Sequence, residues 1–153
     1  MSERLSIAAI LAVPIDKDDD SLNVTLQVLT FTSSSPEESD DIIDQYIGTL
    51  FSPVAWTVTK ASSQFSYPDI QNTLAELKYA RIFSAGLVLM LPQTAETKYH
   101  LSALLLYATS EQQAKTAALS HAAEHFPLFE DFVLKMEELP SDIYERIKTS
   151  NAQ

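Results

Sequence analysis

The chain contains two stretches in which a strand pattern runs directly into a capped helix. In Tyr99–Pro127, apolar residues alternate along YHLSALLLY, which is typical of a strand with a buried face. Ser110 and Gln113 then form a capping-box pattern that predicts the start of a helix. In Val24–Pro53 the motif SPEE, which begins at Ser35, predicts the same kind of start. Two such units constrain the fold more than any other feature of the sequence.

Similarities on either side of these stretches indicate an internal repeat. Leu5–Pro14 and Phe83–Pro92 are both apolar runs that end in proline. Downstream, Tyr67–Ile70 is matched by Leu139–Ile143, again around a proline. The matches are offset by roughly 72 to 78 residues, which is the mark of a duplicated unit.

We therefore predict an α+β protein made of two β-β-α-β-α repeats, residues 1–77 and 78–148, followed by a frayed polar tail at 149–153. In each repeat we expect the strand order third, first, second, a split unit related to ferredoxin-like folds. Pairing between the repeats would remove their open sheet edges. The expected result is one pseudo-twofold domain with an antiparallel or mixed sheet and four helices on one face.

Composition excludes several classes of site. The 153 residues are 46% hydrophobic, which is ample for a core, and they include no cysteine. Disulfides, thiolate metal sites and cysteine nucleophiles are thereby excluded. The only glycines are Gly48 and Gly86, whereas Walker loops and dinucleotide fingerprints need clustered glycines. No cofactor is predicted.

The apolar run near the N-terminus has two interpretations. Leu5–Pro14 follows Arg4 and has the composition of a short secretory signal. The matching run Phe83–Pro92 lies in the middle of the chain, which favours a buried first strand in each repeat. No run reaches the roughly 18 apolar residues of a membrane helix. We expect a soluble cytoplasmic protein that does not bind membranes.

The net charge of −11 is concentrated in the first repeat. Residues 1–77 carry three basic and twelve acidic side chains, and residues 78–153 carry seven basic and nine acidic ones. Two clusters account for the excess, one in the first hairpin loop and one at the start of the first helix. They consist of Asp16, Asp18, Asp19 and Asp20, and of Glu37, Glu38, Asp40, Asp41 and Asp44.

Each acidic cluster has a structural and a functional interpretation. Acids in a first helical turn are stabilised by the helix dipole by about 0.3–1 kcal/mol each, and acids in a hairpin loop keep it solvated. The functional interpretation is a docking surface for a basic protein, since the second repeat has no such clusters. A surface of this sign repels phosphates, so we expect no direct nucleic-acid binding. The two clusters should lie about 30 Å apart, at opposite ends of a strand.

Two patterns suggest metal binding without completing it. The run Asp16-x-Asp18-x-Asp20 begins like a calcium loop, but Ser21 and Gln27 occupy the places that need glycine and glutamate. His121 and His125 are four residues apart, on one face of the predicted helix, with Glu124 beside them. Their counterparts in the first repeat border an apolar stripe. The pattern therefore favours histidines at the edge of the core over a metal site.

No catalytic signature is present in the sequence. The aromatic and aliphatic alternations around Trp56 and Phe132 indicate core ladders, and no basic residues interleave them. The sequence therefore favours a non-enzymatic interaction module, an adaptor, inhibitor or chaperone, that engages a basic surface through its acidic first repeat. Two alternatives stay open. One is a small-molecule or metal-binding module with its site between the repeats, and the other is a homo-oligomer that forms through sheet edges or faces.

Overall fold

The described part of the chain forms ten secondary-structure elements. The computed structural model describes residues 3–15, 25–78, 80–91 and 99–150. Strands and helices follow one another in the same order in the two halves of the chain, strand, strand, helix, strand, helix. The elements are β1 (Arg4–Pro14), β2 (Thr25–Ser33), α1 (Pro36–Leu50), β3 (Trp56–Ser66), α2 (Tyr67–Leu77), β4 (Arg81–Met90), β5 (Tyr99–Ala108), α3 (Glu111–His125), β6 (Asp131–Glu138) and α4 (Ser141–Thr149).

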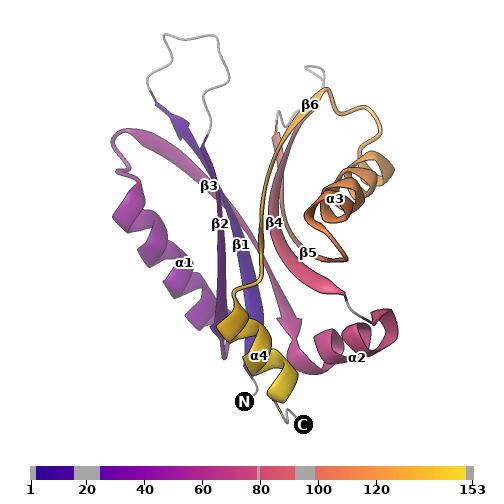
Figure 1. Ribbon diagram of the computed structural model, residues 1–153. Coiled ribbons are helices and arrows are strands. Elements are labelled where there is room, and N and C mark those ends of the chain that lie inside the picture. Colours follow the sequence, from indigo (N-terminus) through magenta and orange to yellow (C-terminus); the bar gives the residue numbers. More distant parts are fainter. Residues whose placement is uncertain (1–2, 16–24, 79, 92–98, 151–153) are drawn as a thin grey trace.

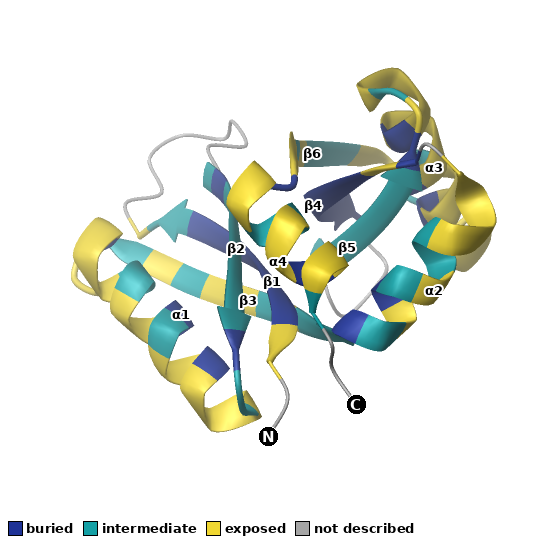
Figure 2. Cartoon of the chain, turned by 60° about the horizontal axis from the view of Figure 1, so that its bottom comes forward, coloured by how far each residue is buried: buried dark blue, intermediate teal, exposed yellow. Residues whose placement is uncertain are grey.

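The strands form two antiparallel sheets of three strands each (Figure 1). Sheet 1 has the order β2-β1-β3 and sheet 2 the order β5-β4-β6. The first strand of each half is therefore central, and the predicted order of third, first, second is confirmed. Both central strands are buried along almost their whole length, as Figure 2 shows in dark blue.

The two sheets pack face to face and do not join through their edges, so the prediction of edge pairing between the halves is wrong. A central strand that is apolar on both faces needs a cover on each side. In β1, Leu5, Ile7 and Ala9 belong to a hydrophobic cluster that includes Ile82 and Ala103 of sheet 2. Alternate residues of β1 pack instead under α1. Stacking the sheets meets both requirements at once.

The two sheets approach each other closely at Gly86 of β4. A Cβ atom at this position would lie 3.0 Å from Cγ2 of Val28 and 3.2 Å from Cβ of Ala9, both in sheet 1. Beside it, the hydroxyls of Thr30 and Ser84 form a hydrogen bond of 2.7 Å between the sheets. A side chain at this position would therefore need Val28 and Ala9 to shift by a few tenths of an ångström, whereas the backbone conformation of Gly86 suits any residue.

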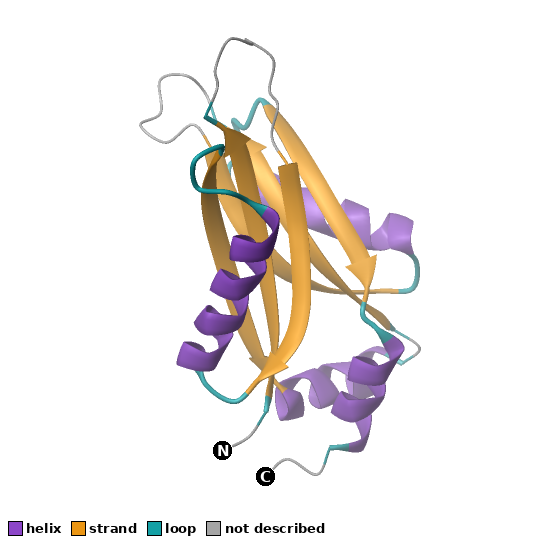
Figure 3. Ribbon diagram, turned by 90° about the vertical axis from the view of Figure 1, so that its left-hand side faces the viewer, coloured by secondary structure: helices purple, strands orange, loops and turns teal. Residues whose placement is uncertain are grey.

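The helices lie on two sides and at one end of the sheets, so the prediction that they all cover one face is also wrong (Figures 1 and 3). Helix α1 packs on the outer face of sheet 1, and α3 packs on the outer face of sheet 2. Helices α2 and α4 contact each other at the end where the termini lie. There, Nε2 of Gln71 donates to the carbonyls of Ile147 and Ser150, at 2.6 and 2.9 Å.

The predicted serine caps are present at both outer helices. The Ser35 hydroxyl accepts from the Glu38 amide and the Ser110 hydroxyl accepts from the Gln113 amide, both at 3.1 Å. The reciprocal bond differs from a standard capping box, because Oε1 of Gln113 accepts from the amide of Thr109, one residue before the cap. The two helices are thus started by the same device.

Candidate docking surface

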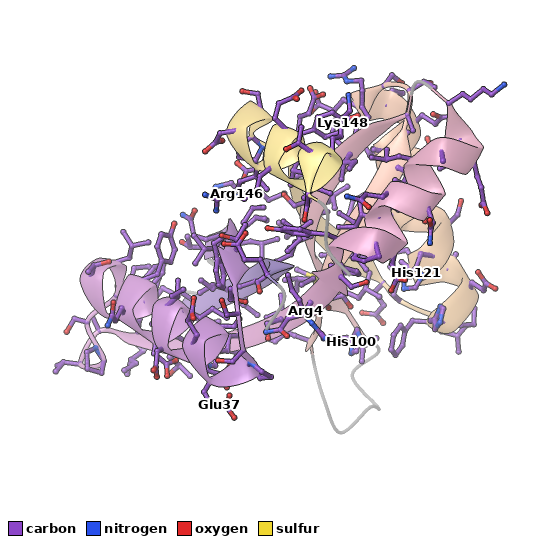
Figure 4. All side chains as sticks on the ribbon, turned by 90° about the horizontal axis from the view of Figure 1, so that it is seen from below. Arg4, Glu37, His100, His121, Arg146 and Lys148 are labelled. Atoms are coloured by element: carbon purple, nitrogen blue, oxygen red, sulfur yellow. The ribbon has the colours of Figure 1, made fainter. Side chains whose placement is uncertain are left out.

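The exposed face of α1 carries five carboxylates and no basic side chain. The helix seats its other face on sheet 1 through Ile43, which is fully buried, and through Tyr46 and Ile47. Helical periodicity then directs the polar positions outward. Figure 4 shows Glu37 extending away from the ribbon. The exposed acids are Glu37, Glu38, Asp40, Asp41 and Asp44, and we call them the α1 acidic face.

One member of the α1 acidic face has a partner in the protein itself. Asp44 accepts a hydrogen bond of 2.7 Å from Nζ of Lys60 on β3. The described residues contain three ion pairs in all, and the other four acids take part in none of them. At Glu38 the backbone amide makes the cap, and no hydrogen bond of its carboxylate is found in the described ranges.

This arrangement is not the most stable one for the helix alone. Glu37 and Glu38 lie in the first turn, where the dipole favours negative charge. Glu37 and Asp41, however, are four residues apart, as are Asp40 and Asp44. Like charges at this spacing destabilise a helix by about 0.2–0.5 kcal/mol per pair. The capping requirement therefore accounts for part of the acidic face and not for all of it.

Helix α3 provides an internal comparison, because it occupies the corresponding place on sheet 2. It has the same length as α1, 15 residues, and a serine cap of the same geometry. Its charged side chains are Glu111, Lys115 and Glu124, so its surface is close to neutral. A helix in this position is thus capped and seated without an acidic face.

The hairpin acids Asp16, Asp18, Asp19 and Asp20 lie outside the described residues. Their nearest described neighbour, Ile15, donates its amide to the carbonyl of Ala55, which follows the C-terminal end of α1. The acids of α1 occupy the first turns at its opposite end. The calcium-loop position Gln27 lies on β2, where Oε1 accepts from Nζ of Lys135 at 3.2 Å.

His121 and His125 lie side by side on the exposed surface of α3. Their ring centroids are 4.3 Å apart, and Nδ1 of His125 is 3.1 Å from the backbone oxygen of His121. His100 stacks instead on Phe126, at 4.4 Å. Across the described part of the chain, no three side chains of the metal-binding types come together. The metal site at His121 and His125 therefore stays a prediction, with these two histidines as its ligands.

An open hollow of about 430 Å³ lies at the start of α4. It is lined by Arg81, Ile82, Glu138, Leu139, Ser141 and Tyr144, all from the second half of the chain. Its two charged groups neutralise each other, because Nε and Nη2 of Arg81 donate to the two Glu138 oxygens at 2.9 and 2.6 Å. These hydrogen bonds lower the pKa of the Glu138 carboxyl. The space between the two sheets, by contrast, is filled by apolar side chains.

One buried phenol has a perturbed pKa in the direction that opposes acid–base chemistry. Burial raises the pKa of Tyr67 to about 12, and the neighbouring Glu3 carboxylate, 3.4 Å from the hydroxyl, adds to the shift. A phenol of this kind keeps its proton at neutral pH. Tyr67 is 1% exposed, at the start of α2, and serves packing.

The sequence did not reveal an apolar corner beside the C-terminal end of α1. Val54 is 84% exposed, and Leu50 and Ile15 are about half exposed at the same corner. The available signal was Val54 directly after Pro53, in the short loop that joins α1 to β3. In the second half, Leu128 of the corresponding loop is 76% exposed. Singly exposed apolar residues are common, so this corner adds area to a docking surface without defining one.

Comparisons with protein-family models, with curated proteins and with solved structures each find no match. No helix in the described ranges is long and apolar enough to cross a membrane. The geometry of the chain is therefore the basis for any inference about its function.

Proposed function

We propose that the protein is a non-enzymatic interaction module of the cytoplasm, an adaptor, inhibitor or chaperone, that binds a basic protein surface through the α1 acidic face. One observation carries the proposal. Helices α1 and α3 occupy corresponding places, have the same length and share the serine cap, yet α1 carries five exposed acids, four of which take part in no ion pair of the described residues, and α3 carries two. The helix dipole accounts for the acids of the first turn, and binding to a basic partner accounts for the others.

Electrostatics sets the character of such an interaction. Exposed carboxylates that face a basic patch increase the rate of association and lose their effect as salt rises. The apolar corner at Ile15, Leu50 and Val54 lies beside the same helix and supplies surface to bury, which the acids do not. We infer a partner whose positive patch faces α1.

We also infer that the two halves are duplicated split ferredoxin-like units related by a pseudo-twofold axis. The support is the shared element order, the central first strand in both sheets and the matching serine caps. On this view the acidic face is a later specialisation of one copy. Residues 1–77 and 78–148 are then the two repeats.

The test is capture of partners from the host lysate by the tagged chain at low and high salt, read out by mass spectrometry. The first variant neutralises the four acids of α1 that lack an ion pair, by Glu37→Gln, Glu38→Gln, Asp40→Asn and Asp41→Asn. Asp44 is kept because it holds Lys60. A matched control neutralises four exposed glutamates elsewhere, by Glu76→Gln, Glu124→Gln, Glu130→Gln and Glu145→Gln.

The proposal predicts basic proteins that the wild type and the control retain at low salt, and that the α1 variant loses. Identical retention by all three chains would contradict it. A third variant changes Asp16, Asp18, Asp19 and Asp20 to asparagine. We expect it to bind more weakly as well, and unchanged binding would remove the hairpin loop from the docking surface.

A further inference from the structure

Strand β6 combines an edge that pairs with no strand among the described residues, called its free edge, with an apolar face that is only partly covered. It is an edge strand of sheet 2, and Phe132, Leu134 and Met136 of its outer face are half-buried. Helix α3 contacts β5 and β4. The alanines of its buried stripe share clusters with the β6 ladder, Ala114 with Met136 and Ala122 with Phe132 and Leu134. The ring of Phe129 lies 6.3 Å from that of Phe132, so the ladder is covered in part. An apolar ladder is left beside an open edge.

The backbone of β6 presents alternate residues to that edge. The amide of Leu139 donates to the carbonyl of Ile82, in register with the pairing of β4 and β6. Hydrogen-bonded pairs recur every second residue in an antiparallel ladder. The odd-numbered residues of β6 therefore bond to β4, and the amides and carbonyls of Phe132 and Leu134 face the free edge.

The opposite face of β6 carries three exposed charged side chains, Asp131, Lys135 and Glu137. Asp131 and Lys135 are both exposed, four residues apart, with Val133 midway between them. Neither takes part in the three ion pairs of the described residues. Asp131 accepts from the amide of Phe132, and Lys135 donates to Gln27. Both side chains are exposed, and pairing with a second copy would replace these hydrogen bonds, including the one that now occupies the Phe132 amide.

We propose that two copies of the chain form a twofold dimer through antiparallel β6 strands centred on Val133. This register sets Asp131 opposite Lys135 of the partner subunit, and the twofold axis makes the same pair a second time. On the other face, Phe132 lies opposite Leu134 of the partner subunit, which extends the apolar ladder across the junction. The two sheets become one of six strands.

The neighbouring registers that keep the faces aligned either lose both charge pairs or place like charges together. Centring the pair on Phe132 sets Asp131 opposite Val133 of the partner subunit, so neither charge pair forms. Centring the pair on Leu134 sets Asp131 opposite Glu137 of the partner subunit. Centring it on Lys135 sets the two lysines against each other. Like charges directly opposite are destabilising in a sheet, so charge complementarity selects Val133 as the centre.

The corresponding strand β3 shows what a protected edge looks like in this protein. Its outer face continues from Val58 into Lys60, Ser62 and Gln64, and Lys60 is held by Asp44. Polar and lysine side chains on an edge strand oppose pairing with another chain. The dimer therefore forms through β6 and leaves the α1 acidic face free on the other sheet.

Sedimentation velocity of the full chain over a wide concentration range tests the dimer. Lys135→Asp and Asp131→Lys each place like charges opposite one another and should each shift the protein to monomer. The double variant restores both pairs in reverse and should restore the dimer. Lys115→Asp, on the exposed surface of α3, makes the same change in net charge as Lys135→Asp and should leave the dimer intact.

A cysteine cross-link reads out the register directly, because the chain has no cysteine of its own. Val133 would form a non-hydrogen-bonded pair with its copy, with Cα atoms about 4.5 Å apart, a distance that suits a disulfide. Val133→Cys should therefore oxidise readily to a covalent dimer, and Ala117→Cys on α3 should not. A wild type that is monomeric at every concentration, a dimer that survives both charge reversals, or cysteines that link equally well at both positions would overturn the proposal.

Discussion

The two outer helices seat on their sheets with different distributions of side-chain size. In the first half, the large Ile43 and Phe51 from the helical segment meet Ala8, Ile10 and Ala12 of the central strand. In the second half the large side chains belong to the strand, where Leu87 and Leu89 meet Ala122 of α3, and Phe83 meets Ala114. Either arrangement fills the layer between helix and sheet. The comparison shows that packing restricts only the inner faces of the two helices, so their outward faces can differ. The acids of α1 lie on such an outward face.

Core substitutions should have the largest effect on this comparison. Ile43→Ala removes the one large, fully buried side chain of α1 and should lower the free energy of unfolding by about 2–5 kcal/mol. In α3, Ala118→Leu adds volume where the helix sits on alanines and should cost about 1–3 kcal/mol. Urea denaturation measures both. A neutral Ala118→Leu would mean that α3 is seated loosely, unlike α1.

The two glycines should respond in opposite directions to the same substitution. Gly86→Ala places a methyl group 3.0 Å from Val28 and should cost about 1–3 kcal/mol by forcing the sheets apart. At Gly48, an added Cβ meets nothing within 4 Å, and alanine favours a helix over glycine. Gly48→Ala should therefore raise the free energy of unfolding by about 1 kcal/mol. Thermal unfolding of both variants checks this, and a tolerated Gly86→Ala would contradict the close contact between the sheets.

A smaller effect on stability is expected at one pair of corresponding buried positions, where α1 has a serine and α3 has an alanine. Ser39 and Ala114 each lie four residues after their cap and are both buried, and no partner for the Ser39 hydroxyl is found in the described residues. Ser39→Ala should stabilise the protein by about 1 kcal/mol, because it removes a buried unsatisfied group. Ala114→Ser should destabilise it. Denaturation curves that shift both variants the same way would show that the two sites are not comparable.

The last effect is absent at neutral pH and appears only in alkaline solution. The Tyr67 phenol has a pKa of about 12 in the folded protein, against an ordinary value near 10. Between these values the folded state retains a proton that the unfolded state has lost, so stability falls as the pH rises. Tyr67→Phe should remove this loss and should flatten the stability profile above pH 10. Equal slopes for wild type and variant would refute the assignment.

Local patterns in the sequence predicted the elements and their order within each half. The alternation of apolar residues predicted the strands, and the capping residues Ser35 and Ser110 predicted the helix starts. Both signals could be recognised because each is complete within a few residues. The stacking of the two sheets was not predicted, because it depends on which faces of β1 and β4 meet. The residue pattern of one strand does not show which face of another strand it will contact.

The alignment between the halves was also one residue out in the central strands. Arg4 pairs with Ser33 as Arg81 pairs with Ala108, so Leu5 corresponds to Ile82 and not to Phe83. In runs that are apolar on both faces, alternation cannot fix the register. The acids of α1 were correctly expected at the start of the helix, but their exposure and the pairing of Asp44 with Lys60 required the packed structure.

The most direct test of the proposed function is calorimetric titration of a captured basic partner at increasing salt. Wild type is compared with the variant that carries Glu37→Gln, Glu38→Gln, Asp40→Asn and Asp41→Asn. We predict that wild-type affinity falls steeply as salt increases, and that the variant binds weakly with little dependence on salt. Equal affinities and equal salt dependence for the two chains would contradict the assignment of α1 as the docking surface.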